Sequence, residues 1–257
     1  MTGLRSLLFN LVAFLWTALL AIAYLPLLGL PRRCMQAGAR LWIRGVMLLV
    51  ASICGLRYRI LDGERIPHGP ALLAVKHQSA WDTLIFHLLC DDPVYVLKRE
   101  LTYIPLFGWY LRKAGNIGID RSAGATSLRA MFPKVKQRLN EGCQVIVFPE
   151  GTRTPPGTRQ PYQPGIAALY PRFAVPLLPV ALNSGLFWGR RRFRKLPGRI
   201  TLEVLQPLPA GLDRRLLLQE LEARIEAATM RLCTGGAADT EAGEATAATP
   251  KTGGAET

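Results

Sequence analysis

The feature that most constrains this chain is an apolar stretch close to its N-terminus. Residues 7–30, LLFNLVAFLWTALLAIAYLPLLGL, contain no charged side chain. As a helix, this stretch is long enough to cross the hydrocarbon core of a bilayer. A second, shorter apolar stretch at 41–56 carries Arg44 and suits a re-entrant, interfacial or buried helix. We therefore predict a membrane-seated helical anchor over residues 1–56.

Two alternatives for the first stretch stay open on sequence alone. Ala21-Ile22-Ala23 resembles the cleavage site of a signal peptide, and a long apolar helix is also compatible with a buried core. Arginines flank the second stretch at positions 32, 33, 40, 57 and 59. Because basic flanks mark the cytoplasmic side of a membrane protein, we expect the domain that follows to face the cytoplasm.

The charge balance points to an anionic partner. The formal net charge is +14, which attracts either nucleic acid or an anionic membrane surface. The apolar start favours the membrane, and the sequence contains no zinc-finger spacing or RNA-recognition motif. Its five cysteines are scattered and form no C-x-x-C pair, which suits a reducing compartment and argues against a metal site.

Beyond the anchor, the pattern is typical of an α/β domain. Short apolar segments alternate with amphipathic ones, which predicts a single mixed or parallel sheet flanked by helices. The expected strands are 71–75, 94–97, 117–119, 144–148 and 200–205, and the expected helices are 82–89, 126–141 and one beginning after an N-cap at Asp213. Segment 175–182 holds two prolines, so we predict an edge strand or an irregular segment.

The domain is expected over residues 57–233. Residues 234–257 are rich in Ala, Thr, Gly and Glu without periodicity, so we expect a disordered tail.

The first polar cluster, which contains His77 and Asp82, directly follows the expected strand 71–75. Five helical steps would separate these two residues by about 140°, so they meet only if His77 lies in a turn and Asp82 begins a helix. A carboxylate in that place holds one imidazole nitrogen and leaves the other free as a general base, as in a Ser–His–Asp triad. A purely structural His–Asp pair is the alternative.

Two more polar clusters follow expected strands. In Ile119-Asp120-Arg121, the guanidinium of Arg121 suits a phosphate, and Asp120 could orient it. In Phe148-Pro149-Glu150-Gly151-Thr152-Arg153, a carboxylate, a hydroxyl and a guanidinium share one sharp turn. Glu150 suits a substrate hydroxyl or a tether to Arg153, which could grip a phosphate. Taken alone, the first of these clusters is also compatible with a surface Asp–Arg pair, and the second with a solvated turn.

Taken in order, His-x-x-x-x-Asp, Ile-Asp-Arg, Phe-Pro-Glu-Gly-Thr-Arg and Val-Pro-Leu-Leu-Pro-Val closely resemble the glycerolipid acyltransferase family. The resemblance covers about residues 56–208 and is strongest to the bacterial 1-acyl-sn-glycerol-3-phosphate acyltransferases. It implies that His77, oriented by Asp82, deprotonates an acceptor hydroxyl, which attacks an acyl thioester directly. The implied glycerol-phosphate site is Arg121, Glu150, Gly151, Thr152 and Arg153, and Pro179 is implied in acyl-donor binding or in shaping the site.

The resemblance also implies the partners and the location. The acceptor would be lysophosphatidic acid and the donor acyl-CoA or acyl-carrier protein, with no cofactor or metal, at the inner membrane of a bacterium. Membrane phospholipids would surround the enzyme. Two rival hypotheses are an acyltransferase for another lysolipid, such as lyso-ornithine lipid, and a noncatalytic membrane-surface scaffold.

Three details complete the sequence analysis. Lys76 stands where the family often has Asn, and Gly118 where a bulky aromatic residue is common. Residues 187–195, FWGRRRFRK, combine aromatic and basic side chains and suit lipid headgroups or the donor, unless they form an ordinary solvated loop.

Overall fold

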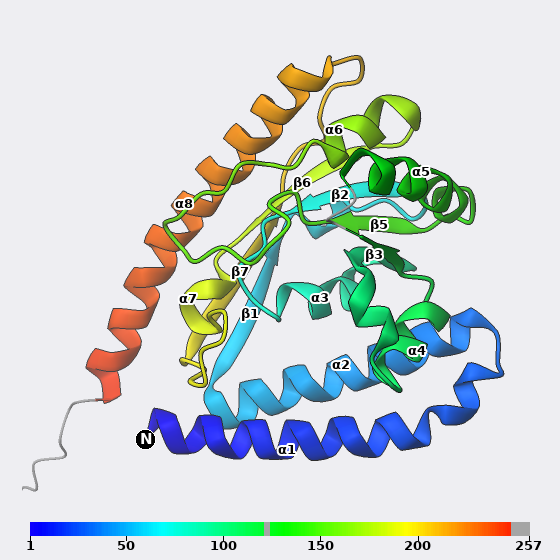
Figure 1. Cartoon of the computed structure of the whole chain (residues 1–257). Coiled ribbons are helices and arrows are strands. Elements are labelled where there is room, and N and C mark those ends of the chain that lie inside the picture. Colours follow the sequence, from blue (N-terminus) through cyan, green and yellow to red (C-terminus); the bar gives the residue numbers. More distant parts are fainter. Residues whose placement is uncertain (121–123, 248–257) are drawn as a thin grey trace, which may run out of the picture.

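The computed structural model describes residues 1–120 and 124–247 (Figure 1). Its described strands form one seven-stranded sheet in the order β1-β7-β6-β2-β5-β3-β4. Neighbouring strands run parallel, except for β6 and β7, which are antiparallel. The strands are β1 (Leu56–Leu61), β2 (Ala71–Val75), β3 (Pro93–Lys98), β4 (Ile117–Ile119), β5 (Gln144–Val147), β6 (Leu177–Leu182) and β7 (Gly198–Val204). The predicted α/β class with a single mixed sheet is confirmed.

Helices cover both faces of the sheet. They are α1 (Thr2–Ala23), α2 (Arg32–Cys54), α3 (Asp82–Leu89), α4 (Phe107–Lys113), α5 (Gly124–Asn140), α6 (Gly165–Leu169), α7 (Ser184–Phe187) and α8 (Arg214–Ala247). Along β2, Leu73 and Val75 join a core with α2, α3 and α7, whereas Leu72 and Ala74 join a second core with α5, α6 and α8. This alternation follows from the two-residue period of a strand that is buried on both faces.

The helix predictions hold closely. α3 has the predicted bounds, and α5 begins two residues before the predicted start. Asp213 caps α8, because its Oδ1 accepts hydrogen bonds from the amides of Arg215 and Leu216 at 2.8 and 2.9 Å. A short side chain that satisfies otherwise unpaired amides is what fixes the start of a helix.

The edge position predicted for segment 175–182 is wrong. β6 lies inside the sheet, between β2 and β7. Pro179 is tolerated there because its nitrogen faces the same side as its carbonyl, which accepts the amide of Leu205 at 2.9 Å. That side is the end of the β6–β7 ladder, which pairs from Val180 onward. Only one terminal bond is therefore lost to the proline.

Two other segments differ from the sequence-based expectation. β1 was not predicted, because its alternating arginines at 57 and 59 look like the basic flank of an anchor. In the structure β1 is an edge strand, where alternating polar side chains are readily accommodated. Residues 234–247, expected to be disordered, continue α8, since their alanines favour extension of a helix already packed on the sheet. Residues 248–257 lie outside the described part of the chain.

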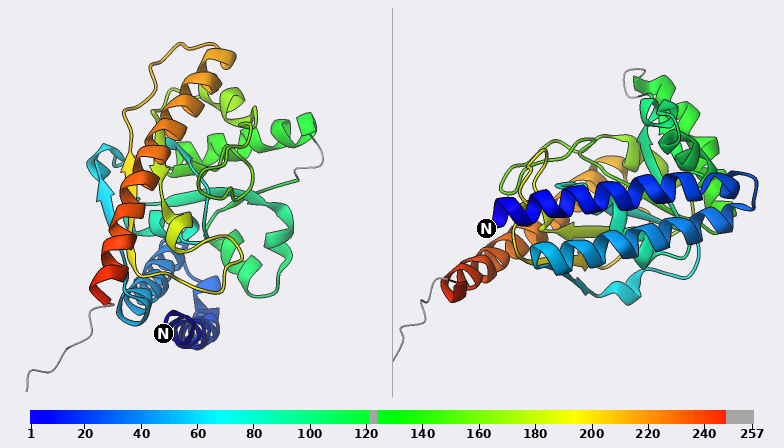
Figure 2. Two further views of the ribbon diagram at one scale, coloured as in Figure 1. Left: turned by 90° about the vertical axis from the view of Figure 1, so that its left-hand side faces the viewer. Right: turned by 90° about the horizontal axis from the view of Figure 1, so that it is seen from below.

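The anchor is a pair of helices that lie side by side beneath the domain (Figures 1 and 2). Both are long and apolar enough to cross a membrane by length and composition. Only Ser6 and Phe9 of α1 are buried, so the alternative of a buried core helix is wrong for α1. Its outward face exposes Leu4, Leu7, Leu8, Leu11, Phe14, Leu15, Leu19 and Ile22.

Candidate active site

The predicted contact between His77 and Asp82 is present in the turn that joins β2 to α3. His77 Nδ1 lies 3.1 Å from Asp82 Oδ2, with His77 in the turn and Asp82 as the first residue of α3. A carboxylate only accepts hydrogen bonds, so Nδ1 carries the hydrogen of this contact and Nε2 keeps its lone pair. The geometry leaves Nε2 as the nitrogen able to take a proton.

Asp82 is fully buried and surrounded by donors. Its Oδ2 also accepts the amides of Gln78 and Ser79, each at 2.7 Å, and its Oδ1 accepts the hydroxyl of Ser184 at 2.5 Å. Ser184 begins α7, 102 positions further along the chain, and the sequence analysis did not find it. These bonds fix the carboxylate before any substrate arrives.

The turn after β5 supports the other side of His77. Its Phe148 ring stacks on the imidazole, with centroids 3.9 Å apart. The amide of Thr154 donates to the carbonyl of His77 at 2.7 Å. Gly151 has a φ of +70°, a left-handed conformation that glycine adopts without strain. The turn therefore brings residues 151–153 to the same side of the sheet as His77.

Glu150, which the sequence predicted to bind the glycerol phosphate, points away from the cavity in the described structure. It is buried, and its Oε1 accepts Lys76 Nζ at 2.7 Å while its Oε2 accepts the amide of His77 at 3.2 Å. Both carboxylate oxygens are thus engaged behind the histidine. Proximity to the buried ammonium of Lys76 explains why Glu150 points inward while the neighbouring Arg153 lines the cavity.

The remaining predicted residues have different outcomes. Arg121 lies outside the described residues. Asp120 accepts a hydrogen bond from Arg99 at 2.8 Å. Pro179 is buried in β6 beside Ala74 of β2, and the described residues that line the cavity do not include it. A role of Pro179 in acyl-donor binding or in shaping the site stays a prediction.

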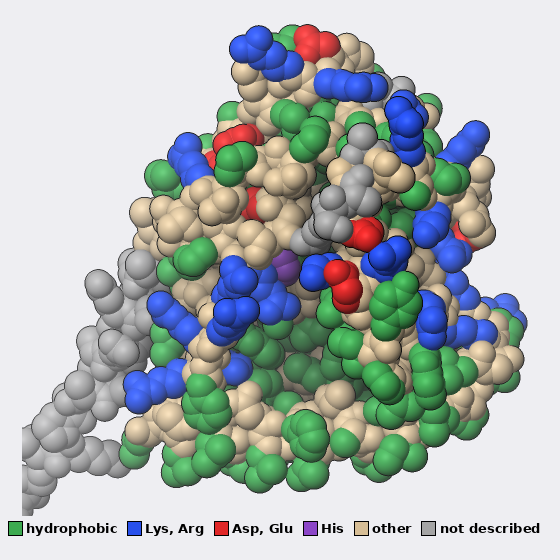
Figure 3. Space-filling view, viewed as in Figure 1, with side chains coloured by type: hydrophobic (Ala, Val, Ile, Leu, Met, Phe, Trp, Pro, Cys, Tyr) green, Lys and Arg blue, Asp and Glu red, His purple; other side chains and the backbone are tan. Residues whose placement is uncertain are grey.

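A cavity of about 850 Å³ opens in front of His77. Its polar end holds His77, Thr152 and Arg153, together with Arg190 and Arg191. Its remaining walls are mostly apolar and include Phe9, Ala13 and Phe14 of α1, Trp42 and Val46 of α2, and Leu84 of α3. Figure 3 shows the hollow, with basic side chains at its upper rim and apolar side chains within and below it. The cavity therefore joins a cationic mouth to an apolar interior that reaches the anchor.

A second histidine, His87, lies in the last turn of α3 and also lines the cavity. Burial, assisted by the charge of Arg40, lowers its pKa to about 4. It is neutral at pH 7, next to the buried ring of Tyr95 at a centroid distance of 5.5 Å. Among the described residues, no group of three or more His, Cys, Asp or Glu side chains could hold a metal ion.

The described residues that line the cavity include no serine or cysteine. An oriented histidine beside space for a long apolar chain suits activation of a hydroxyl that a substrate brings with it. This geometry is typical of a transferase that acts on a substrate with a long apolar chain.

Comparisons with known proteins agree with that class. Residues 57–183 match a family model described as acyltransferase. The chain is 33% identical over 229 residues to a 1-acyl-sn-glycerol-3-phosphate acyltransferase of Pseudomonas aeruginosa, covering 88% of each chain. It is 28% identical over 160 residues to the beta form of that enzyme in Homo sapiens, covering 61% of this chain and 58% of the human protein.

The fold also matches a solved structure, the 1-acyl-sn-glycerophosphate acyltransferase PlsC of Thermotoga maritima. The TM-score is 0.74 at 22% identity, covering 90% of this chain and 98% of the other. The chain therefore belongs to the glycerolipid acyltransferase family, within its 1-acyl-sn-glycerol-3-phosphate acyltransferases. The family predicted from the sequence motifs is therefore confirmed.

Proposed function

We propose that this protein transfers a fatty acyl group from a thioester to the sn-2 hydroxyl of lysophosphatidic acid, forming phosphatidic acid. One observation carries the proposal: His77, with Nε2 available, lies where the arginine-lined mouth of the cavity meets its apolar interior. A lysophosphatidate molecule has the same division, with a phosphate at one end and an acyl chain at the other. Its free hydroxyl lies between the two.

The reaction needs one base and no covalent enzyme intermediate. His77 Nε2 takes the proton of the sn-2 hydroxyl as its oxygen attacks the thioester carbonyl. The imidazolium is stabilised by the carboxylate of Asp82, which is held in place by four hydrogen bonds. The new C–O bond forms, the C–S bond breaks, and the leaving thiolate takes the proton back from His77. General base catalysis of this kind contributes about 10²–10⁴-fold.

The mouth of the cavity suits the phosphate of the acceptor. Arg153 lies on the turn that also contacts the backbone of His77, so a phosphate bound to its guanidinium would lie close to the base. Thr152 adds a hydroxyl beside it. Arg190 donates to the carbonyl of Arg153 at 3.1 Å and reinforces this arrangement.

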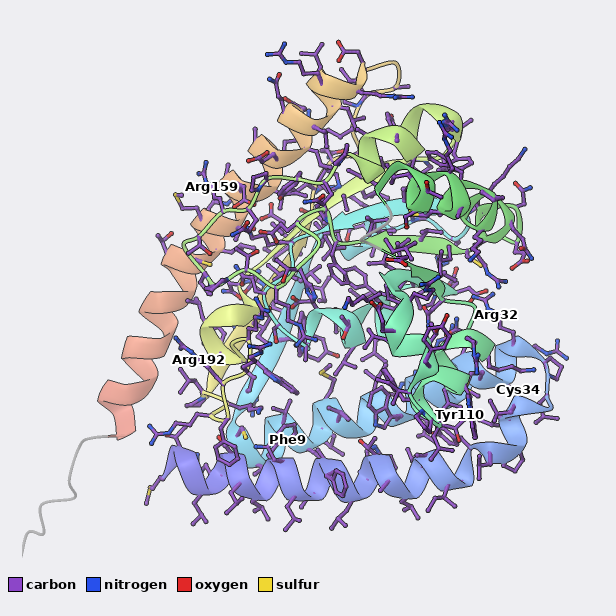
Figure 4. All side chains as sticks on the ribbon, in the orientation of Figure 1. Phe9, Arg32, Cys34, Tyr110, Arg159 and Arg192 are labelled. Atoms are coloured by element: carbon purple, nitrogen blue, oxygen red, sulfur yellow. The ribbon has the colours of Figure 1, made fainter. Side chains whose placement is uncertain are left out.

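The anchor suits a seat in one leaflet of the membrane, with α1 parallel to its plane. Both halves of α1 contact the same domain: Phe9 packs edge-to-face on Trp188 at 5.5 Å, and the hydroxyl of Tyr110 donates to the carbonyl of Ala21. Figure 4 shows Phe9 in the N-terminal half of this helix and Tyr110 near its C-terminal end. If α1 stood upright, these contacts would be about 18 Å apart along the membrane normal and would draw part of the polar domain into the hydrocarbon core, which is about 30 Å thick. We infer that its exposed apolar face is immersed from one side.

The arginine loop, residues 190–194, supports the same orientation. It is exposed, and the adjoining Lys195 is tied to α1, since its amide donates to Ser6 Oγ at 2.9 Å and its Nζ donates to Asn10 at 3.2 Å. Four arginines thus lie next to an apolar helix, at the level of the lipid phosphates. Together with the basic flanks of α2, this favours a catalytic domain on the cytoplasmic side of the bacterial inner membrane.

The proposal is tested with purified protein in detergent or vesicles. Lysophosphatidic acid is offered with acyl-CoA or with acyl-carrier protein, and the product is identified by mass spectrometry. We expect phosphatidic acid with at least one donor, and the more active donor is then assigned. Lyso-ornithine lipid serves as a competing acceptor without a phosphate. Acylation of that lipid alone, with both donors, would contradict the proposal.

A further inference from the structure

Three charged side chains from distant parts of the chain meet behind His77. Lys76 directly follows β2, Glu150 lies in the turn after β5, and Glu226 lies on α8. Lys76 Nζ is 2.7 Å from Glu150 Oε1 and 2.7 Å from Glu226 Oε1. All three side chains are buried, and that of Lys76 is only 1% exposed. This Lys76 cluster is therefore an ion triad shielded from water.

A fourth group completes the cluster. The hydroxyl of Tyr162 donates to Glu226 Oε1 at 3.0 Å, so this oxygen accepts from two donors. Burial and the neighbouring carboxylate of Glu226 raise the pKa of Tyr162, which keeps its hydroxyl protonated as a donor. Glu226 is thus held in one place by an ammonium and a phenol.

The Lys76 cluster is bonded to the main chain of the base. Glu150 presents one oxygen to Lys76 and the other to the amide of His77, at 3.2 Å. The amide of Lys76 itself donates to the carbonyl of Val180 at 2.9 Å. Moving the Glu150 carboxylate would therefore move both His77 and the turn that carries Arg153.

Stability alone does not account for such a cluster. Buried ion groups cost desolvation, and apolar side chains of similar volume often replace them without loss of stability. What a fully bonded buried network supplies is one fixed geometry. Here that geometry is shared by the base and the turn at the mouth of the cavity.

We propose that Glu226 is a positioning residue for acyl transfer, which acts through Lys76 and Glu150 to hold the main chain of His77 and the turn after β5. The proposal rests on the function proposed above. It makes α8 part of the active site, although Glu226 lies 149 positions beyond His77 in the sequence.

A double-mutant cycle tests the proposal. Glu226→Gln keeps the shape and one acceptor, whereas Lys76→Met leaves two buried carboxylates facing each other. We expect the kcat for phosphatidic acid formation to fall about 10- to 100-fold in Lys76→Met, with a smaller rise in KM for lysophosphatidic acid because the same turn carries Arg153. Adding Glu226→Gln to Lys76→Met removes one of the opposed carboxylates, so the double variant recovers part of the lost kcat.

The matched control is Glu220→Gln, the same chemical change on the same helix, where Glu220 pairs with Arg224 at the surface. We expect its kcat to equal that of wild type. If Glu226→Gln or Lys76→Met changes the melting temperature but leaves kcat at the wild-type value, the cluster has a merely structural role and the proposal is overturned. The proposal is also overturned if the kcat loss of the double variant equals the product of the losses in the two single variants.

A second readout does not depend on the substrate. Hydrogen–deuterium exchange of the peptide that contains His77 reports on the hydrogen bond that its backbone amide donates to Glu150. We expect faster exchange there in Lys76→Met and wild-type exchange in Glu220→Gln. If wild type makes no phosphatidic acid but this exchange responds, the proposed acceptor is wrong and the positioning network stands. If exchange is unchanged, the network does not hold His77, and the positioning proposal fails.

Discussion

The two sides of His77 use their polar groups in opposite ways. Behind the imidazole, the carboxylates of Asp82 and Glu150 are buried, and every one of their oxygens accepts a hydrogen bond. In front, Thr152 and Arg153 line an open cavity whose far walls are apolar. The rear is therefore organised before substrate binds, while the front is available to ligands. The comparison separates groups that set the rate from groups that set affinity.

The largest effect of a single charge is expected at the rear. In Asp82→Asn, the amide oxygen can replace Oδ2 and the amide nitrogen can donate to Ser184, so the fold and the orientation of His77 are kept. The negative charge that stabilises the imidazolium is lost. We expect kcat to fall by about 10²–10⁴-fold, with KM nearly unchanged, in steady-state assays. A kcat within threefold of wild type would remove Asp82 from the mechanism.

At the front, the effect should appear in affinity. Arg153→Ala removes a charged partner for the acceptor phosphate, an interaction of about 1.5–3 kcal/mol. We therefore expect KM for lysophosphatidic acid to rise about 10- to 100-fold, with a smaller change in kcat. Arg215→Ala, on the exposed start of α8, is the matched control. Equal KM values in the two variants would place the phosphate elsewhere.

The apolar wall of the cavity should show itself in the pH dependence of stability. The pKa of His87 is about 4 in the folded protein and near 6.5 when exposed, so the unfolded chain binds this proton more tightly. Stability is therefore lost as the pH falls from about 6.5 toward 4, by about 2 kcal/mol at pH 5.

Replacement by an apolar residue should remove that dependence. His87→Leu should lose less free energy of unfolding between pH 7 and pH 5 than wild type, as measured by chemical denaturation in detergent. His68→Leu, at an exposed position, should follow wild type. Parallel curves for His87→Leu and wild type would mean that His87 is not buried in solution.

The smallest effect on kcat is expected from Ser184, which contacts Asp82 and not His77. Ser184→Ala removes the hydroxyl that donates to Asp82 Oδ1. A hydrogen bond to a charged group contributes about 1.5–3 kcal/mol, but the three other donors to Asp82 remain. We expect a kcat loss of no more than about tenfold, which Ser184→Thr should partly restore. A loss as large as that of Asp82→Asn would mean that the rear side depends on α7 as much as on the carboxylate.

The separation of two residues along the chain decides how much of their contact the sequence could predict. His77 and Asp82 lie five positions apart at a strand–helix junction, so a local motif contains the contact. The apolar periodicity of α5 and the cap at Asp213 are likewise local. These features follow from the residues themselves and were predicted.

Contacts between distant segments could not be predicted in this way. Ser184 is 102 positions from Asp82, and Glu226 is 150 positions from Lys76. A lysine directly after a buried apolar strand does signal that an acidic partner exists, since buried lysines are rarely unpaired. Which acidic residue is that partner depends on how α8 packs against the sheet. The inward orientation of Glu150 and the central place of β6 have the same origin in tertiary packing.

The most direct test of the central claim compares wild type with His77→Gln in the initial rate of phosphatidic acid formation at saturating substrates. Circular dichroism and melting temperature establish that both proteins fold alike. The proposed mechanism predicts product from wild type and a rate at least about 10²-fold lower in the variant. A folded variant that retains a rate within about threefold of wild type would contradict the assignment of His77 as the base.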